Sequence, residues 1–470
     1  MNAMPTTTRT LRSIDPSSGE LIEEFQPMAD AEVDAAVAEA HGAFPDWRRR
    51  SFAQRADAMR DAAAVLRRDA ERLAGVITRE MGKTLAESRA EVEKCAFCCD
   101  HYAEHAEELL GDIPMPSDSP DSFVAFEPIG VVLAVMPWNF PLWQVFRFAA
   151  PSLMAGNTAV LKHAANVTRC ALEIEDVFRR AGFPDGVFRT LLVPGGAVSR
   201  VIEDARIRAV TLTGSDATGS SVARTAGEQL KKTVLELGGS DAFIVLGDAD
   251  LERAAEVGAR SRFQNCGQSC IAAKRFIVVD AVAEEYEERL AAHAKALRVG
   301  DPRDERTQMG PMAREDLREA LEDQVRRAVA EGARVAAGGH RTGERGWYHE
   351  ATVLTGCTTE STAFREETFG PVAAVMRVRD EEQAVEVANA SQFGLGGNLW
   401  TRDVERGIAL ARRLDTGGVF VNGMTHSDPR IPFGGVKRSG YGRELSGFGI
   451  REFVNVQTIW VEGRAAAATA

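Results

Sequence analysis

The chain has 470 residues, a hydrophobic content of 44% and seven cysteines. At about 150 residues per domain, this length predicts two or three modules. The net charge of -13 argues against nucleic acid as a general partner. No run of about 18 apolar residues occurs, so no membrane partner is expected. The odd cysteine count, and an N-terminus "MNAMPTTTRTLRS" without an apolar signal segment, predict reduced thiols in a cytoplasmic protein.

The first part of the chain is predicted to be helical, because residues 30–110 are alanine-rich and charged, with apolar positions at helical spacing. After residue 120 the texture changes to short apolar runs separated by helical stretches. The runs are "VVLAVM", "TAVLKH", "VFRTLLV", "AVTLTG", "AFIVLG", "FIVVD", "VAAVMRV" and "GVFVNG". Val- and Ile-rich strands that alternate with amphipathic helices form parallel sheets covered on both faces. The predicted fold class is therefore α/β.

Two β-rich segments interrupt this alternation, "DSFVAFEPIG" at 121–130 and "EFVNVQTIWVE" near the C-terminus. Both are predicted to be edge strands that extend beyond the main body. Exposed edges of this kind are often completed by another subunit, so a homodimer or homotetramer is expected. The final residues 463–470, "GRAAAATA", are predicted to be disordered.

The segment "AVTLTGSDATG" is a candidate phosphate-binding turn. An apolar strand leads into Gly214, Ser215 and Gly219, and a helix is predicted to begin near Ser220. Backbone N–H groups at a helix N-terminus stabilise a pyrophosphate. An ordinary strand–turn–helix junction is the alternative interpretation, because neither G-x-G-x-x-G nor a P-loop is present.

A second candidate is the segment "MPWNFPLWQVFR", where two prolines confine Trp138, Asn139 and Phe140 to a rigid turn. An amide held in this way is suited to stabilise an oxyanion. The alternative is a turn in which Asn139 bonds to its own backbone.

The segment "VLELGGSD" places Glu236 within an apolar strand, directly before two glycines. Poor solvation there would raise the carboxyl pKa toward the range of a general base. A structural glutamate with a satisfied partner is the alternative.

The segment "RFQNCGQSC" contains Cys266 and Cys270, which could be half of a metal site, a disulfide, or one nucleophile with an idle neighbour. A zinc site needs two further ligands, and the remaining cysteines and eight histidines offer none at a suitable spacing. No metal is therefore predicted. Cys95, Cys98 and Cys99 lie on a predicted helix, where packing is the expected role.

The motifs "PWNFP", "LKHA", "TGSDATG", "LELGG", "NCGQSC" and "EETFGPV" resemble, in order and spacing, those of the NAD(P)-dependent aldehyde dehydrogenases. The resemblance extends from about Ile14 to Trp460. It implies two doubly wound parallel-sheet domains and a small β oligomerisation element. The implied ranges are 1–112 and 130–235 for the NAD(P)-binding domain, 236–445 for the catalytic domain, and 113–129 and 446–462 for the oligomerisation strands.

The resemblance implies that Cys270 attacks the aldehyde and that Asn139 and the Cys270 backbone N–H hold the oxyanion of the thiohemiacetal. Glu236 would then activate the water that hydrolyses the thioester. The implied cofactor-binding residues are Trp138, Lys162, Gly214, Ser215, Gly219, Glu367 and Phe369. Ala165 stands where NAD-specific members often have a glutamate, so NADP is expected to be tolerated as well as NAD.

Within the family, "LWQVFR", "AAKRFIV" and "FGGVKRSGYGREL" most resemble bacterial succinate semialdehyde dehydrogenases. Arg147, Ser427 and Arg430 are the implied substrate-binding residues, with His426 and Arg262 nearby in sequence. The fit is incomplete, because a second arginine of some relatives corresponds to Gln264.

The alternatives are another small aliphatic or aromatic aldehyde, a coenzyme A-acylating enzyme, and a Cys hydrolase without nicotinamide. Glu236 favours hydrolysis by water over transfer to coenzyme A. Cys266 is expected to pack in the interior, and a regulatory disulfide with Cys270 is the alternative role.

Overall fold

The computed structural model of the protein describes residues 10–119 and 121–462. The tail 463–470, predicted to be disordered, lies outside these residues. The first part of the chain is helical, as predicted, and its four helices are α1 (Asp30–Arg48), α2 (Phe52–Arg68), α3 (Ala70–Met81) and α4 (Leu85–Leu109). Ser51 caps α2 and Thr84 caps α4, because each hydroxyl accepts the backbone N–H three residues on. No helix of the described residues is long and apolar enough to cross a membrane.

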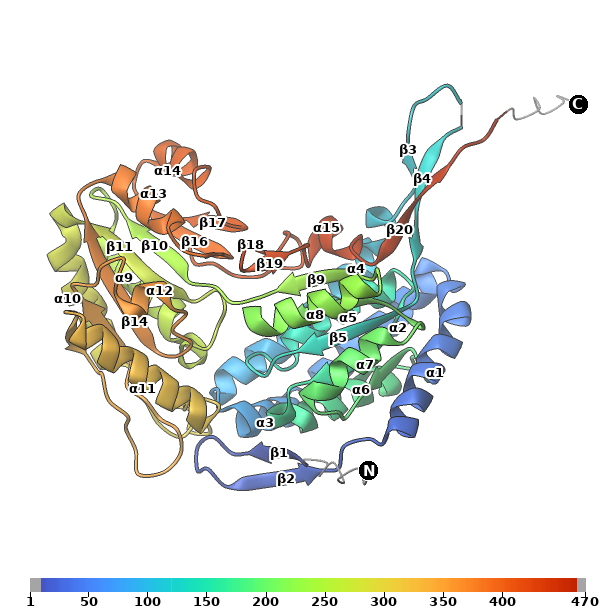
Figure 1. Ribbon diagram of the computed structural model, residues 1–470, viewed down its shortest axis with the longest axis horizontal. Coiled ribbons are helices and arrows are strands. Elements are labelled where there is room, and N and C mark those ends of the chain that lie inside the picture. The colour runs from blue at the N-terminus through green and yellow to red at the C-terminus, as the bar shows by residue number, and fades with distance from the viewer. Residues whose placement is uncertain (1–9, 120, 463–470) are drawn as a thin grey trace, which may run out of the picture.

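A six-stranded sheet forms the centre of the first body (Figure 1). Its order is β19 (Gly440–Tyr441), β9 (Lys232–Glu236), β8 (Ile207–Thr213), β5 (Val131–Met136), β6 (Thr158–His163) and β7 (Phe188–Thr190). All pairs are parallel except β19–β9. The helices that follow its strands are α5 (Trp143–Met154), η1 (Ala165–Val167), α6 (Thr168–Arg180), η2 (Gly195–Ala197), α7 (Val198–Glu203) and α8 (Asp216–Glu228). Every residue of β5 is buried, which explains its uninterrupted apolar sequence.

A seven-stranded sheet forms the second body. Its order is β12 (Arg334–Ala337), β13 (Thr352–Thr355), β14 (Val372–Val378), β11 (Ala273–Val279), β10 (Asp241–Val245), β16 (Gly396–Trp400) and β17 (Gly418–Val421), and only β12–β13 is antiparallel. The accompanying helices are α9 (Leu251–Phe263), η3 (Gln264–Gly267), α10 (Asp280–Ala296), α11 (Glu315–Ala330), α12 (Thr362–Arg365), α13 (Glu381–Asn389) and α14 (Val404–Ala411). The short helix α15 (Ser446–Ile450) packs against α4 and α5 of the first body. The α/β prediction is confirmed. The domain ranges stay predictions, and β19, within the range 236–445, pairs with the first sheet.

The two β-rich segments that interrupt the alternation pair with each other. They form β4 (Phe123–Pro128) and β20 (Val454–Ile459), which with β3 (Ile113–Pro114) make a three-stranded antiparallel sheet. This sheet projects from the body as an arm (Figure 1). Smaller two-stranded sheets are β1 (Leu11–Ile14) with β2 (Leu21–Phe25), and β15 (Phe393–Gly394) with β18 (Val436–Lys437).

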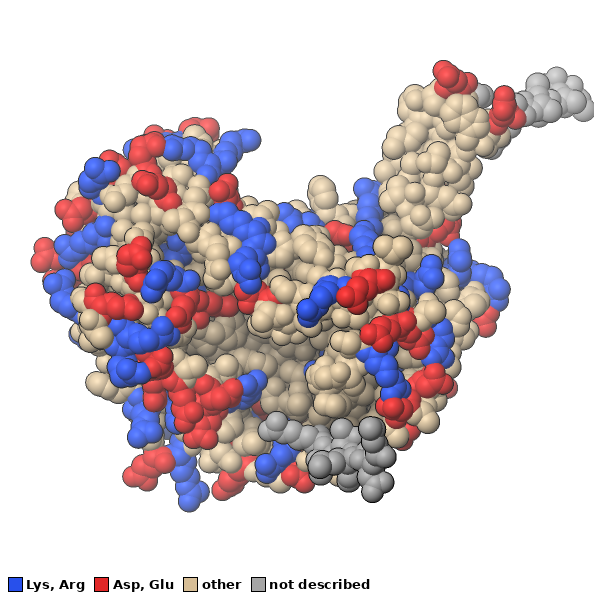
Figure 2. Space-filling view, viewed as in Figure 1, with Lys and Arg blue, Asp and Glu red and all other residues tan. Residues whose placement is uncertain are grey.

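Parallel pairing determines where the candidate residues gather. Since β5, β8 and β9 are parallel neighbours, their carboxyl ends share one edge of the sheet. Asn139 follows β5, Ser215 follows β8, and Glu236 ends β9. Figure 2 shows that the surface is hollowed between the two bodies and that acidic and basic side chains are mixed over the outer face. The fold therefore brings distant motifs to the edge that faces this hollow.

Candidate active site

The loop that carries Cys270 links α9 to β11 and is fixed by buried cations. Lys274 donates from Nζ to the carbonyl oxygens of Ser269 and Cys270, each at 2.9 Å. Arg262, fully buried, donates to the carbonyl of Gly267 at 2.9 Å. Arg262 therefore supports the loop and does not face the substrate cavity, although it lies near the site in sequence. Lys274 was not singled out in the sequence.

Asn139 lies directly against this loop. Its Nδ2 donates to the carbonyl oxygen of Gln268 at 3.0 Å, and its own backbone carbonyl accepts from Nδ2 of Asn265 at 2.9 Å. The side chain is therefore not engaged with its own backbone, which was the alternative for this turn. A primary amide has two N–H donors, so one remains for an oxyanion.

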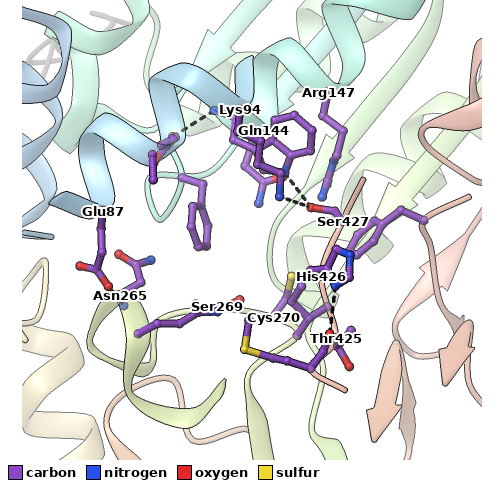
Figure 3. A pocket seen from close by; sticks show the side chains of 18 residues that line it. Glu87, Lys94, Gln144, Arg147, Asn265, Ser269, Cys270, Thr425, His426 and Ser427 are labelled. Atoms are coloured by element: carbon purple, nitrogen blue, oxygen red, sulfur yellow. Dashed lines mark hydrogen bonds between the residues drawn. The ribbon is translucent and has the colours of Figure 1, made fainter. Parts of the chain in front are cut away.

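Cys270 faces a cavity of about 240 Å³ between the two bodies (Figure 3). Its walls are mainly apolar and aromatic, from Phe140, Trp143, Ile271, Met424 and Phe433. This is smaller than the roughly 300–1,000 Å³ of pockets for drug-sized ligands, which fits a short aldehyde. Burial raises the pKa of the Cys270 thiol to about 12, opposed by the charges of Arg147 and Lys274.

Glu236 is buried, and both of its carboxylate oxygens lack a hydrogen-bond partner among the described residues. Burial, and next the charge of Glu444, raise its pKa well above the usual value. Its charge also contributes to the raised pKa of Cys270, which places the two groups in one electrostatic environment. Glu236 is not among the residues that line the cavity. A buried carboxyl without a partner fits a general base, and this role stays a prediction.

Arg147 forms a buried ion pair with Glu444, a residue that was not singled out in the sequence. The guanidinium also donates to Oγ1 of Thr213 at 3.3 Å and lies 4.6 Å from the ring centroid of Phe433. Arg147 lines the cavity, and Glu444 compensates its charge only in part, because that charge also acts on the pKa values of Cys270 and Lys94.

The other two residues implied for substrate binding lie differently from each other. Ser427 lines the cavity, whereas Arg430 does not. The Arg430 guanidinium pairs with Asp428 at 2.6 Å, and its side chain is 66% exposed. The expected contact of Arg430 with the substrate is therefore not supported, because its own neighbour holds it at the surface. His426 does line the cavity, as does Gln264.

Lys94 is a cavity residue that sequence reasoning missed. It comes from α4, whose residues Glu87, Glu91 and Lys94 recur at helical spacing along one wall. Its Nζ donates to Oγ of Ser427 at 2.9 Å (Figure 3). Only the helical period was visible in the sequence, and it did not show which face of α4 meets the active site.

A larger cleft of about 830 Å³ lies beside the predicted cofactor residues Lys162 and Ala165. Burial lowers the pKa of Lys162. The amide nitrogen of Asn166, which also lines the cleft, is buried without a partner among the described residues. An open cleft with a lysine and an unused amide donor, and with no glutamate at 165, fits a phosphorylated dinucleotide.

The turn after β8 has the geometry of a helix N-terminus. Ser215 caps α8, which begins at Asp216 and not near Ser220 as predicted, since the Ser215 hydroxyl accepts the Thr218 N–H at 3.3 Å. Gly214 precedes the cap. Gly219 lies inside α8, where a Cβ would come within 2.5 Å of Leu237. The glycine thus allows α8 to pack closely on the strand end.

The remaining predicted cofactor residues form one cluster. Glu367 pairs with Lys274 at 3.1 Å and accepts the Gly239 N–H at 3.0 Å. The rings of Trp138 and Phe369 meet edge to face, with centroids 5.7 Å apart. The structure therefore joins Glu367 to the loop of Cys270 through Lys274.

Cys266 and Cys270 differ in environment although they share a loop. Cys266 is 2% exposed within the core of the second body, and Cys270 packs against the core of the first. Burial raises the pKa of the Cys266 thiol. The cysteines are free thiols, and no group of three His, Cys, Asp or Glu residues in the described chain could hold a metal ion.

Comparison with known proteins identifies the family that this fold and site define. Residues 3–459 match the model of the aldehyde dehydrogenase family, and the chain belongs to this family, as predicted.

Within this family, the chain is similar to succinate-semialdehyde dehydrogenases. The chain is 51% identical to succinate-semialdehyde dehydrogenase (NADP+) 1 of Mycobacterium tuberculosis over 96% of this chain and 99% of the relative. It is 49% identical to a probable succinate-semialdehyde dehydrogenase (NADP+) of Synechocystis, with the same coverage of both chains. Its fold matches the crystal structure of succinic semialdehyde dehydrogenase from Streptococcus pyogenes in complex with NADP+, with a TM-score of 0.94, 38% identity, and coverage of 96% of this chain and 100% of that one.

Proposed function

We propose that the protein oxidises succinate semialdehyde to succinate, with NADP or NAD as the hydride acceptor. The observation that carries the proposal is the position of Cys270 in a small cavity whose walls also present Ser427 and Arg147. The substrates in the names of the relatives support the same aldehyde.

In the proposed reaction, the thiolate of Cys270 adds to the aldehyde carbon, and the carbonyl oxygen becomes an alkoxide. The free N–H of Asn139 and the backbone N–H of Cys270 stabilise this charge. The bound nicotinamide supplies an acceptor for the hydride of the thiohemiacetal carbon, which leaves a thioester on Cys270. Glu236 then takes a proton from water, whose oxygen attacks the thioester and releases the acid and the Cys270 thiolate.

The cleft beside Lys162 and Ala165 is proposed to hold the adenosine end of the cofactor. Lys162 would donate to the ribose or its phosphate, and Ser215 and Gly214 would present the N-terminus of α8 to the pyrophosphate. Ala165→Glu tests this placement. The added carboxylate should weaken binding of NADP at least about tenfold more than binding of NAD, as measured by fluorescence titration, because it repels the 2′-phosphate. Equal weakening of both cofactors would contradict it.

A panel of aldehydes tests the substrate. We expect kcat/KM for succinate semialdehyde to exceed that for glutarate semialdehyde, uncharged aliphatic aldehydes and aromatic aldehydes, with either cofactor. If an uncharged aldehyde has the highest kcat/KM, the proposed substrate is wrong. A product assay with and without coenzyme A separates hydrolysis from acyl transfer, and aldehyde consumption that requires coenzyme A would contradict the role of Glu236.

The arm is proposed to mediate the assembly of a homodimer or homotetramer. A cytoplasmic location is also proposed, because the cysteines are free thiols. Its strand β20 has exposed apolar side chains, with Val456 60% exposed and the adjoining Trp460 52% exposed. Such a surface is typical of a contact with a second copy. Sedimentation equilibrium of Val456→Asp should show a smaller assembly than the wild type, and an unchanged mass would contradict the proposal.

A further inference from the structure

The cavity has a polar end in which side chains from three separate segments converge. Lys94 comes from α4, Trp143 from the start of α5, and Ser427 from the loop after β17. The Ser427 hydroxyl oxygen accepts from Lys94 Nζ at 2.9 Å and from Trp143 Nε1 at 3.0 Å (Figure 3). The Lys94 ammonium also lies 4.3 Å from the Trp143 ring centroid. We call these three residues the polar end.

The carboxylates near this end are already engaged. Glu444 is paired with Arg147, and Glu91 is paired with Lys83. Glu91 also accepts the backbone N–H groups of Leu142 and Trp143 at 2.8 and 3.0 Å. Over residues 10–119 and 121–462, no carboxylate lies within ion-pair distance of Lys94. Lys94 is therefore the cation of this cavity without an anionic partner.

The donors at the polar end are also incompletely used. Lys94 has three N–H groups, of which one reaches Ser427. Because the Ser427 oxygen accepts from two N–H donors, its own hydrogen is directed elsewhere, and none of the described residues accepts it. Several donors and a positive charge thus face the cavity without an acceptor. Only a ligand with an anionic oxygen would satisfy both the charge and the donors.

We propose that Lys94 is a specificity-determining residue, which together with Ser427 binds the carboxylate at the end of the substrate remote from the aldehyde. Arg147, whose charge Glu444 compensates, positions the groups beside it and contributes less to anion recognition. Some relatives have a second arginine at the position of Gln264, and Lys94 would provide the missing positive charge. This inference rests on the proposed function, since it requires a substrate with a remote carboxylate.

The electrostatics of the free protein agree with this role. Burial, and next the charge of Arg147, lower the pKa of Lys94 to about 8. A carboxylate within hydrogen-bond distance would favour the charged ammonium and raise this pKa. The substrate therefore supplies the interaction that the free site lacks.

Lys94→Met tests the inference, because methionine keeps an unbranched stem and removes the charge. We expect kcat/KM for succinate semialdehyde to fall at least about 30-fold, mainly through KM, as when one partner of a buried charge pair is removed. For 4-methylpentanal, an uncharged molecule of nearly the same shape, we expect a much smaller fall or a rise. Lys94→Arg, which keeps the charge, should recover most of the preference. Equal losses for both aldehydes, or an arginine variant as poor as the methionine variant, would overturn the inference.

Lys295→Met is the matched control, since Lys295 is exposed on α10 and its loss changes the net charge equally. It should leave both kcat/KM values at the wild-type level, and the thermal midpoints of all variants verify folding. Calorimetric binding of succinate provides a readout without turnover, and Lys94→Met should weaken it about tenfold or more. If succinate binding depends on Lys94 while the wild type prefers uncharged aldehydes, the proposed function fails and the anion site stands. If the wild type prefers succinate semialdehyde and Lys94→Met changes neither readout, the Lys94 inference fails alone.

Discussion

The two ends of the substrate cavity are built on opposite electrostatic principles. We call Cys270, which lines the cavity, together with Asn139 and Glu236, which do not line it, the reactive end. Burial raises the pKa of both Cys270 and Glu236, so the free protein disfavours negative charge there. At the polar end, which comprises Lys94, Trp143 and Ser427, a cation has no anionic partner among the described residues. In the proposed function, the reactive end becomes negatively charged only during the reaction, whereas the polar end is positively charged before the substrate binds.

This difference shows how one small cavity could separate chemistry from recognition. Arg147 lines the same cavity, and its charge acts on Lys94 at the polar end and on Cys270 at the reactive end. It is paired with Glu444, so its field is partly compensated. An uncompensated arginine beside Cys270 and Glu236 would stabilise both anions in the free protein. The ion pair with Glu444 therefore helps the pKa values of Cys270 and Glu236 to stay raised, although Arg147 and Lys274 are close to Cys270.

The largest effect is expected from removing the thiol of the reactive end. Cys270→Ala should lower kcat by about 10⁴-fold or more, as loss of a nucleophile does in other enzymes. Reduced cofactor is followed by absorbance at saturating aldehyde. The control Cys266→Ala, in the same loop, should retain activity within about threefold, because a buried packing thiol contributes to stability and not to the reaction. Substantial turnover by Cys270→Ala would remove the basis of the comparison.

The second prediction separates two steps of the proposed reaction, hydride transfer and thioester hydrolysis. Glu236→Gln should slow thioester hydrolysis by about 10²–10³-fold, because the base for water is lost. The first turnover should still yield a burst of reduced cofactor in stopped flow, since the thiol and Asn139 are unchanged. Loss of the burst together with the steady state would mean that Glu236 acts before hydride transfer.

The third prediction tests whether Glu444 compensates Arg147. Glu444→Gln should lower the free energy of unfolding by about 3–5 kcal/mol, because it leaves a buried guanidinium unpaired. Urea denaturation measures the change. The control Glu127→Gln breaks a pair whose side chains are 42% and 43% exposed, and it should cost less than about 1 kcal/mol. Similar losses in the two variants would show that the charge of Arg147 is not held by Glu444.

The smallest expected effect is a pH dependence, which tests whether the pKa of Cys270 is raised in the free protein. With the Cys270 pKa raised to about 12, the thiolate fraction of the cofactor-free protein should rise with pH throughout the neutral range. Inactivation by iodoacetamide should therefore accelerate about tenfold per pH unit between pH 7 and pH 9. A plateau below pH 9 would indicate a thiolate stabilised by nearby cations, and the reactive end would then resemble the polar end.

The sequence by itself predicted the residues proposed for the reactive end, because each of them lies in a short contiguous motif. Asn139 lies between two prolines, Glu236 ends an apolar strand before two glycines, and Cys270 lies in a glycine-bearing loop. A strand end or tight turn fixes such residues locally, and parallel pairing then brings them to one edge. The family, the α/β fold and the helical first segment were predicted for the same reason.

Only the tertiary structure decided the polar end and the partners of the charged groups. Lys94 and Ser427 are 333 residues apart, and Arg147 meets Glu444 from another part of the chain. Neither contact leaves a pattern along the sequence, because each depends on how whole helices and loops pack. The same limit applies to Arg430, for which the family resemblance implied a substrate contact and which the structure pairs with Asp428 at the surface. Local chemistry is encoded in neighbouring residues, whereas the compensation of charge is a property of three-dimensional packing.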